Sequence, residues 1–184
     1  MRFRRTNIRL PAPVYIGRRR FFLTLCCENR NHALADGSLA RRVIEVLRET
    51  ARRHAFVVHA YCLMPDHLHA LVEGRDVSSN CLNFVGHFKR QTTVLFRQAS
   101  PCASLWQKKF YDHILRGRDP LPSVAAYIWM NPVRQGIVSK PEDYPYSGSF
   151  VVDWTKAPQP TSAWTPPWKL PPTLGAGAHH TTVS

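Results

Sequence analysis

The sequence predicts an α+β domain with a ferredoxin-like fold, in which an antiparallel sheet carries helices packed on one face. Two observations lead to this prediction. Segments with strand and helix character follow one another in the order β-α-β-β-α-β, which is the ferredoxin-like order. In addition, 44% of the 184 residues are hydrophobic, which suits one globular domain with a buried core.

The first half of this order comes from residues 21–73. Residues 21–28 are rich in strand formers and predict a first strand. A turn and cap at Asp36 precede apolar residues at helical spacing up to about His54. Residues 55–63 and 67–73 read as two strands on either side of a Pro-Asp turn, so they predict a hairpin.

The second half comes from residues 79–131. Apolar positions at helical spacing predict a second helix over 79–98, and residues 105–115 predict a fourth strand. Asp119 can cap a short late helix that runs through Tyr127 to Asn131, where the following proline stops it. The domain is therefore expected over 1–150, with a basic N-terminal arm, and residues 151–184 are expected to form a Pro-rich extended or disordered tail.

The charge balance favours a polyanionic partner. The chain has 25 Lys and Arg against 12 Asp and Glu, a formal net charge of +13, and many arginines fall in the first twenty residues. Nucleic acid is the commonest polyanion in a cell, so we expect nucleic-acid binding.

Cysteine usage and hydropathy favour a cytoplasmic protein. Five cysteines form no CxxC pair, and an odd number is a poor disulfide framework. The apolar run at 21–27 is short for a signal-peptide core and far too short for a membrane span. We therefore expect reduced thiols and no membrane segment.

Two histidines stand one residue apart in the third predicted strand. Side chains alternate along a strand, so His67 and His69 point to one face of the sheet and Leu68 points to the other. Two imidazoles on one face can share a divalent ion. An HxH pair also occurs by chance as two ordinary half-exposed histidines, so the pair needs further support.

The late helix supplies a candidate nucleophile and a candidate third ligand. Tyr127 and Asn131 are four residues apart, which places them on one helix face. A tyrosine hydroxyl can attack a phosphodiester, and the Asn131 amide oxygen can complete a metal site. The alternative is that Tyr127 is a core-edge aromatic and that Asn131 only ends the helix before Pro132.

Several spaced motifs resemble one known family. The chain is similar to the single-tyrosine HUH transposases, and most of all to their REP-associated branch, from about residue 21 to 150, in the strings LMPDHLHALVEG, FKRQTT, LWQKKFYDHILR, YIWMNPVRQGIV and EDYPYSG. The resemblance implies that His67 and His69 are the metal motif and that Tyr127 is the nucleophile. The wider group often has Gln four residues after the tyrosine, where this chain has Asn131.

The resemblance also implies a reaction. The tyrosine attacks single-stranded DNA beside a hairpin-forming repeat, forms a 5′-phosphotyrosine link and releases a 3′-OH, with no ATP required. Mg²⁺ or Mn²⁺ suits imidazole and oxygen ligands without thiolate. The resemblance to the REP-associated branch favours a monomer over a homodimer.

Basic side chains are the expected contacts to the DNA backbone, and Trp106 or Phe110 could stack on splayed bases. The predicted backbone contacts are Arg2, Arg4, Arg5, Arg18, Arg19, Arg20, Lys89, Arg90, Lys108, Lys109 and Arg116.

Two alternatives remain open. Tyr111 with His113 is a second Tyr/His set, ranked below Tyr127 because the resemblance places the nucleophile on the helix. A non-catalytic hairpin DNA- or RNA-binding protein, such as a domesticated transposase, is the competing function, since ferredoxin-like sheets also serve as RNA-recognition platforms.

Overall fold

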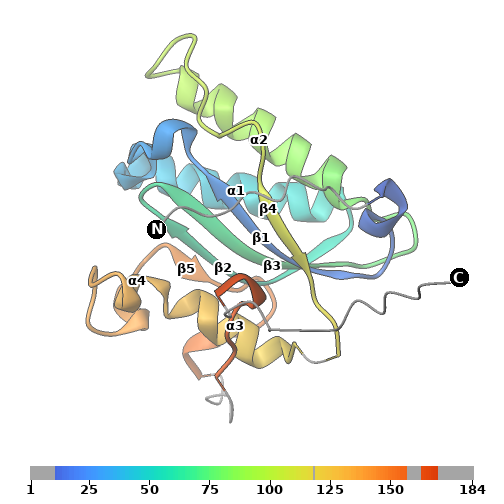
Figure 1. Ribbon diagram of the computed structural model, residues 1–184. Coiled ribbons are helices and arrows are strands. Elements are labelled where there is room, and N and C mark those ends of the chain that lie inside the picture. Colours follow the sequence, from blue (N-terminus) through green and yellow to red (C-terminus); the bar gives the residue numbers. More distant parts are fainter. Residues whose placement is uncertain (1–10, 118, 157–162, 170–184) are drawn as a thin grey trace, which may run out of the picture.

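The structure, a computed structural model, describes residues 11–117, 119–156 and 163–169. They contain a five-stranded antiparallel sheet with the strand order β4-β1-β3-β2-β5 (Figure 1). The α+β class and the antiparallel sheet are confirmed. The strands are β1 (Arg20–Cys26), β2 (Phe56–Met64), β3 (His67–Gly74), β4 (Tyr111–Ile114) and β5 (Ser147–Gly148).

Helices cover both faces of this sheet. The two long helices α1 (Gly37–Arg53) and α2 (Cys81–Arg97) pack on one face, as predicted, while α3 (Leu121–Trp129) and the single turn α4 (Asn131–Arg134) lie on the other (Figure 1). The second layer arises because the central strands are apolar on both sides, as expected for strands that are buried on both faces.

The two faces hold separate hydrophobic clusters. Leu68 and Val72 of β3 belong to the cluster under α1 and α2. Phe22, Cys62 and Leu71 belong to the cluster under α3. The late helix therefore packs on the face opposite to the long helices.

The β2–β3 hairpin forms as predicted. Met64 pairs with His67 across the turn, Cys62 pairs with His69, and Thr24 of β1 lies opposite His69 on the other side. The alternation predicted for the histidine pair is confirmed, because Leu68 is 1% exposed in the α1–α2 cluster and both imidazoles project toward the α3 side.

The fourth strand is shorter than the predicted 105–115, because only Tyr111–Ile114 pairs with β1. Trp106 instead forms an isolated bridge with Cys27, is 2% exposed, and donates from Nε1 to Thr92 Oγ1 at 2.7 Å. The suggestion that Trp106 stacks on DNA bases is therefore wrong, and the reason is that its indole fills the core under α2. Phe110 is half-buried against the same cluster.

None of the helices in the described ranges combines the length and the hydrophobicity that a bilayer crossing requires.

Candidate metal and nucleophile site

The two imidazoles of the HxH pair converge on one point. The His67 Nε2 and His69 Nε2 atoms are 3.1 Å apart. The opposite ring nitrogens are held by neighbours: His69 Nδ1 is 2.8 Å from Thr24 Oγ1, and His67 Nδ1 is 2.5 Å from a carboxylate oxygen of Asp66. Both Nε2 atoms are thereby oriented to the same side of the sheet.

This separation fits two ligands of one ion. Two nitrogens about 2.1 Å from an ion would be about 3.0 Å apart at a right angle and about 3.4 Å apart at a tetrahedral angle. The observed 3.1 Å lies nearer the octahedral value. Within the described ranges, no group of three or more His, Cys, Asp and Glu side chains is arranged to hold a metal.

The surroundings keep His69 neutral. Burial lowers the pKa of His69 well below its usual value, and the positive charges of His67, Arg134, Arg30 and Lys169 lower it further. A neutral imidazole keeps a lone pair for a ligand. The supporting partner Asp66 stays ionised: desolvation raises its pKa, but the hydrogen bond from His67 and the charges of His67 and Arg30 outweigh that effect and lower it.

Tyr127 lies on the same face as the histidines. The Phe22 ring contacts the His69 ring at a centroid distance of 5.4 Å and the Tyr127 ring at 6.2 Å. Tyr127 is half-buried, so its ring is neither sealed in the core nor turned to the other side of the sheet. The structure thus brings together the predicted nucleophile and the predicted metal pair.

Arg134 is a component of the site that the sequence analysis did not select. Its guanidinium carbon lies 4.0 Å from the Tyr127 ring centroid, and its Nη2 donates to the Tyr127 carbonyl at 2.7 Å. The sequence feature that could have identified Arg134 is its spacing of seven residues, about two helical turns, from Tyr127. Arg134 places a cation beside both Tyr127 and His69.

The Asn131 side chain forms hydrogen bonds to the end of α3. The helix α3 ends at Trp129, and Asn131 begins the turn α4. Asn131 is 6% exposed, and its Nδ2 donates to the carbonyls of Tyr127 at 3.3 Å and Ile128 at 3.0 Å. The helix thus ends two residues before the predicted end at Asn131, and the assignment of Asn131 as a metal ligand stays a prediction.

Part of the predicted tail packs on the site. Trp164 is 9% exposed, and its ring meets the Tyr127 ring edge-on at 5.2 Å and the Phe22 ring at 5.5 Å. Lys169 Nζ lies 5.4 Å from the Tyr127 ring centroid. The segment 163–169 therefore forms one side of the surroundings of Tyr127.

Asp119 fixes this segment and does not cap α3. The residue before α3 is Pro120, and no side chain caps that helix. Instead, the buried Asp119 carboxylate accepts from Trp164 Nε1 at 2.9 Å and from the Arg116 backbone N–H at 2.9 Å, and it lies 3.1 Å from His113 Nε2. The predicted cap is wrong because three donors from other segments occupy the carboxylate.

Replacing Asp119 by Ala should destabilise the fold. The change leaves buried donors without an acceptor, which costs on the order of 2–3 kcal/mol. Urea unfolding should show a lower midpoint with an unchanged slope. Asp153→Ala is the matched control, because the Asp153 carboxylate also accepts a hydrogen bond, from the Thr155 hydroxyl, but is exposed, so its loss should change stability by less than about 0.5 kcal/mol. Equal effects of the two substitutions would contradict the assignment.

The rival Tyr111 is a poorer nucleophile by its environment. Desolvation of its hydroxyl raises the pKa of Tyr111 well above its usual value, and Asp112 raises it further. Its companion His113 lies against Asp119. Both features favour Tyr127 as the reactive phenol.

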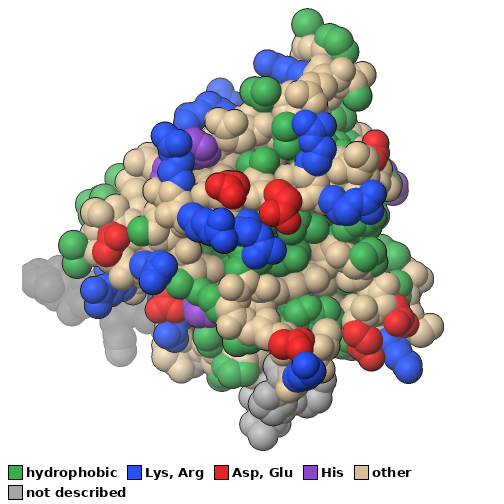
Figure 2. Space-filling model, turned by 180° about the vertical axis from the view of Figure 1, so that it is seen from behind, with side chains coloured by type: hydrophobic (Ala, Val, Ile, Leu, Met, Phe, Trp, Pro, Cys, Tyr) green, Lys and Arg blue, Asp and Glu red, His purple; other side chains and the backbone are tan. Residues whose placement is uncertain are grey.

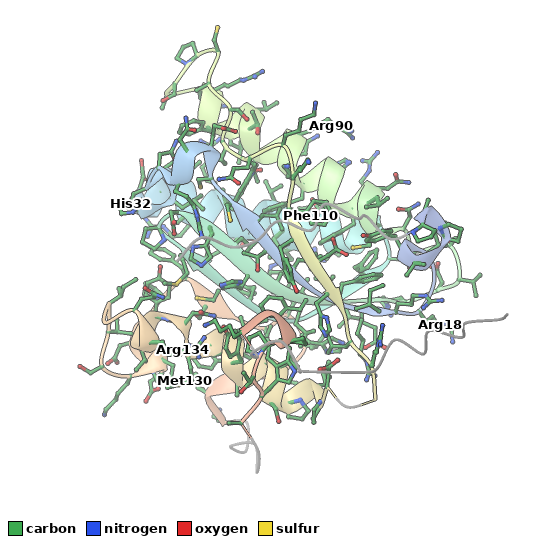
Figure 3. All side chains as sticks on the ribbon, viewed as in Figure 1. Arg18, His32, Arg90, Phe110, Met130 and Arg134 are labelled. Carbon is green, nitrogen blue, oxygen red and sulfur yellow. The ribbon has the colours of Figure 1, made fainter. Side chains whose placement is uncertain are left out.

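The basic residues that were predicted to contact the DNA backbone differ in their exposure and in the contacts that they already make. Arg18, Arg19, Arg90, Lys108, Lys109 and Arg116 are exposed, and Figure 3 shows Arg18 and Arg90 on the periphery. Arg20 is exposed but pairs with Glu73 at 3.0 Å. Lys89 Nζ donates to the Gln107 and Lys108 carbonyls, which ties this lysine to the segment before β4. Arg2, Arg4 and Arg5 lie outside the described residues.

Comparisons with known proteins show to which family the chain is similar. Residues 19–131 match the family model described as IS200-like transposase. A REP-associated tyrosine transposase of Escherichia coli K12 is 28% identical over 154 residues, covering 76% of this chain and 87% of the relative. A Haemophilus influenzae protein with a provisional assignment of the same kind is 26% identical over 137 residues, covering 69% and 77%.

A solved structure shares the fold. It shows a REP-associated tyrosine transposase bound to a REP hairpin, with a TM-score of 0.64 and 22% identity over 78% of this chain and 82% of that chain. The family match spans both histidines, Tyr127 and Asn131. The chain therefore belongs to the IS200-like transposase family.

Proposed function

We propose that the protein is a metal-dependent single-stranded DNA endonuclease and strand transferase that cleaves at hairpin-forming repeats through a 5′-phosphotyrosine intermediate. One observation carries the proposal: the Phe22 ring contacts both His69 and Tyr127, so the phenol and the imidazole pair share one face of the sheet. A phenol on the same face as two convergent imidazoles, with the Arg134 guanidinium against its ring, suits phosphoryl transfer, in which positioning and charge stabilisation dominate.

The reaction balances without an external energy source. The Tyr127 oxygen attacks a backbone phosphorus, the bond from phosphorus to the 3′ oxygen breaks, and the departing oxygen takes a proton to become a 3′-OH. The phenol proton passes to solvent. A 3′-OH can later attack the phosphotyrosine and reverse the exchange, which rejoins strands.

The side chains of this site have separate roles in the proposal. Thr24 and Asp66 hold the two rings so that their Nε2 atoms face the substrate side. Mg²⁺ or Mn²⁺ held by His67 and His69 would neutralise charge on the scissile phosphate. Arg134 restrains Tyr127 and adds positive charge beside it.

The charge and one solved neighbour support the choice of substrate. A formal charge of +13 favours nucleic acid, and one solved relative is bound to a REP hairpin. We propose hairpin DNA with adjoining unpaired bases as the substrate, bound by a monomer.

A covalent-adduct assay tests the proposal. The protein is incubated with end-labelled hairpin DNA and Mn²⁺, and the products are separated on a denaturing gel. A labelled band at the mass of the protein plus DNA is the expected result, and chelation with EDTA should remove it. Hairpin binding without any adduct would sink the catalytic part of the proposal.

Replacing Arg134 by Ala should slow cleavage on the order of a hundredfold, as for the loss of one preorganised donor or charge in other enzymes. Hairpin affinity should change much less. Arg97→Ala is the matched control, because Arg97 also donates to a backbone carbonyl, at 2.9 Å from Ala103, but it lies on α2. Single-turnover cleavage and fluorescence anisotropy separate the two effects, and equal cleavage rates for both variants would contradict the role of Arg134.

The non-catalytic hairpin-binding protein is the second candidate. The observation in its favour is that the described residues offer no third His, Cys, Asp or Glu ligand beside the imidazole pair. Such a protein would bind hairpins with the same affinity in EDTA and in Mn²⁺ and would form no adduct.

A further inference from the structure

A group of basic side chains lies on the face of the protein that is remote from the candidate site. Arg53 and His54 are at the C-terminal end of α1, and His87 and Arg90 are one turn apart on α2. The rings of His54 and His87 meet at a centroid distance of 5.0 Å, which shows that the two helices bring these residues together. We name Arg53, His54, His87 and Arg90 the α1–α2 basic cluster.

The cluster has no neutralising partner in the described part of the chain. Neither Arg53 nor Arg90 forms an ion pair there, whereas Arg48 and Arg52 on the same helix pair with Glu45 and Glu49. Cations at a helix C-terminus are favourable by themselves, which accounts for Arg53 and His54. It does not account for two further basic residues that α2 adds to the same place.

Two further observations concern the histidines of the cluster. The Nε2 atom of His54 is buried and has no hydrogen-bond partner, which is costly for a polar atom. Burial and the neighbouring cations lower the pKa of both histidines: His87, Arg53 and Arg90 act on His54, and Arg53 and Arg90 act on His87. No carboxylate is among the groups that act on either histidine.

We propose that the α1–α2 basic cluster binds a backbone phosphate of DNA at a second site, separated from the cleavage site by the sheet. Arg53 and Arg90 are exposed and would supply charge-assisted hydrogen bonds, and each histidine would add a donor when protonated. Figure 2 shows Lys and Arg side chains gathered on this side of the molecule, some of them next to a histidine. The proposal rests on the DNA-binding part of the proposed function and adds a contact to it.

Salt-dependent binding tests the arginines. Arg53→Gln/Arg90→Gln is compared with Arg48→Gln/Arg52→Gln, which has the same net charge but alters residues that already have carboxylate partners. In EDTA, with labelled hairpin DNA, the first variant should lose affinity on the order of tenfold, and the slope of log affinity against log salt should fall by about 1 to 2. The control should lose much less.

The possible results separate this proposal from the proposed function. Equal losses in the two double variants, or no loss in either, would overturn the second site while leaving cleavage at Tyr127 standing. No DNA binding by the wild type would overturn both. Tighter binding of an RNA hairpin of the same sequence would overturn the choice of DNA.

The pH dependence of binding tests the histidines. A phosphate raises the pKa of a nearby imidazole, so the complex holds more protons than the free protein and affinity should rise as pH falls from 7.5 to 5.5. His54→Gln/His87→Gln should show a smaller rise. Because the other histidines are unchanged, the difference between the two pH profiles isolates the pair, and identical profiles would overturn the proposal as stated.

Discussion

Replacing Tyr127 by Phe should abolish the covalent protein–DNA adduct and leave hairpin affinity unchanged. The substitution removes the attacking oxygen and keeps the ring that packs on Phe22, Trp164 and Arg134. The effect on adduct formation should therefore be complete, because no other group replaces the lost bond to phosphorus. A denaturing gel measures the adduct, and anisotropy with the same labelled hairpin measures affinity.

Tyr111→Phe is the matched control for this experiment. Tyr111 is 40% exposed on the edge strand β4, and its environment raises the pKa of its hydroxyl. The Tyr111 variant should form the adduct at the wild-type rate. An adduct that persists without the Tyr127 hydroxyl but disappears without that of Tyr111 would assign the nucleophile to β4.

Replacing His67 or His69 by Ala should lower the cleavage rate on the order of a thousandfold, in the range seen when one group that stabilises transition-state charge is removed. Hairpin affinity should stay near the wild-type value, because we assign binding to arginines and lysines elsewhere on the surface. Calorimetric titration with Mn²⁺ in the absence of DNA gives an independent readout, in which both variants should lose the binding signal.

Thr24→Val and His59→Ala refine the interpretation of the histidine variants. Thr24 supports only the far nitrogen of His69, so its loss should weaken Mn²⁺ binding by about 10- to 100-fold without abolishing it. His59, on the adjacent strand β2, contacts Glu73 and should have no effect on Mn²⁺. Parallel losses of DNA affinity and cleavage in the His67 variant would instead indicate a folding role for that ring.

Local sequence patterns were sufficient for most of the fold and for the shared face of His67 and His69. The period of two in β3 placed His67 and His69 on one face, and the Pro-Asp turn fixed the hairpin register. The helical period likewise located α1 and α2 to within two residues of their ends. These features depend on neighbours in the chain, which is why the sequence alone could predict them.

The remaining parts of the site depend on contacts between distant segments. Trp164 reaches Tyr127 because Asp119 accepts its indole N–H across 45 residues, and no periodicity encodes that contact. The hydrogen bond from the Asn131 amide to the Ile128 carbonyl depends on where α3 ends. Helix ends are poorly determined by periodicity. The α1–α2 basic cluster arises from the packing register of two helices, which single-helix patterns do not specify.

The contact between Trp164 and Tyr127 has a practical consequence for protein production. A shortened chain that stopped after residue 150 would retain His67, His69 and Tyr127. It would therefore contain every residue of the predicted site motifs. It would nevertheless expose the phenol ring on the side that the indole now covers and would remove the ammonium group of Lys169 from that ring. Rates measured on such a fragment would describe a different chemical environment from that of the intact polypeptide.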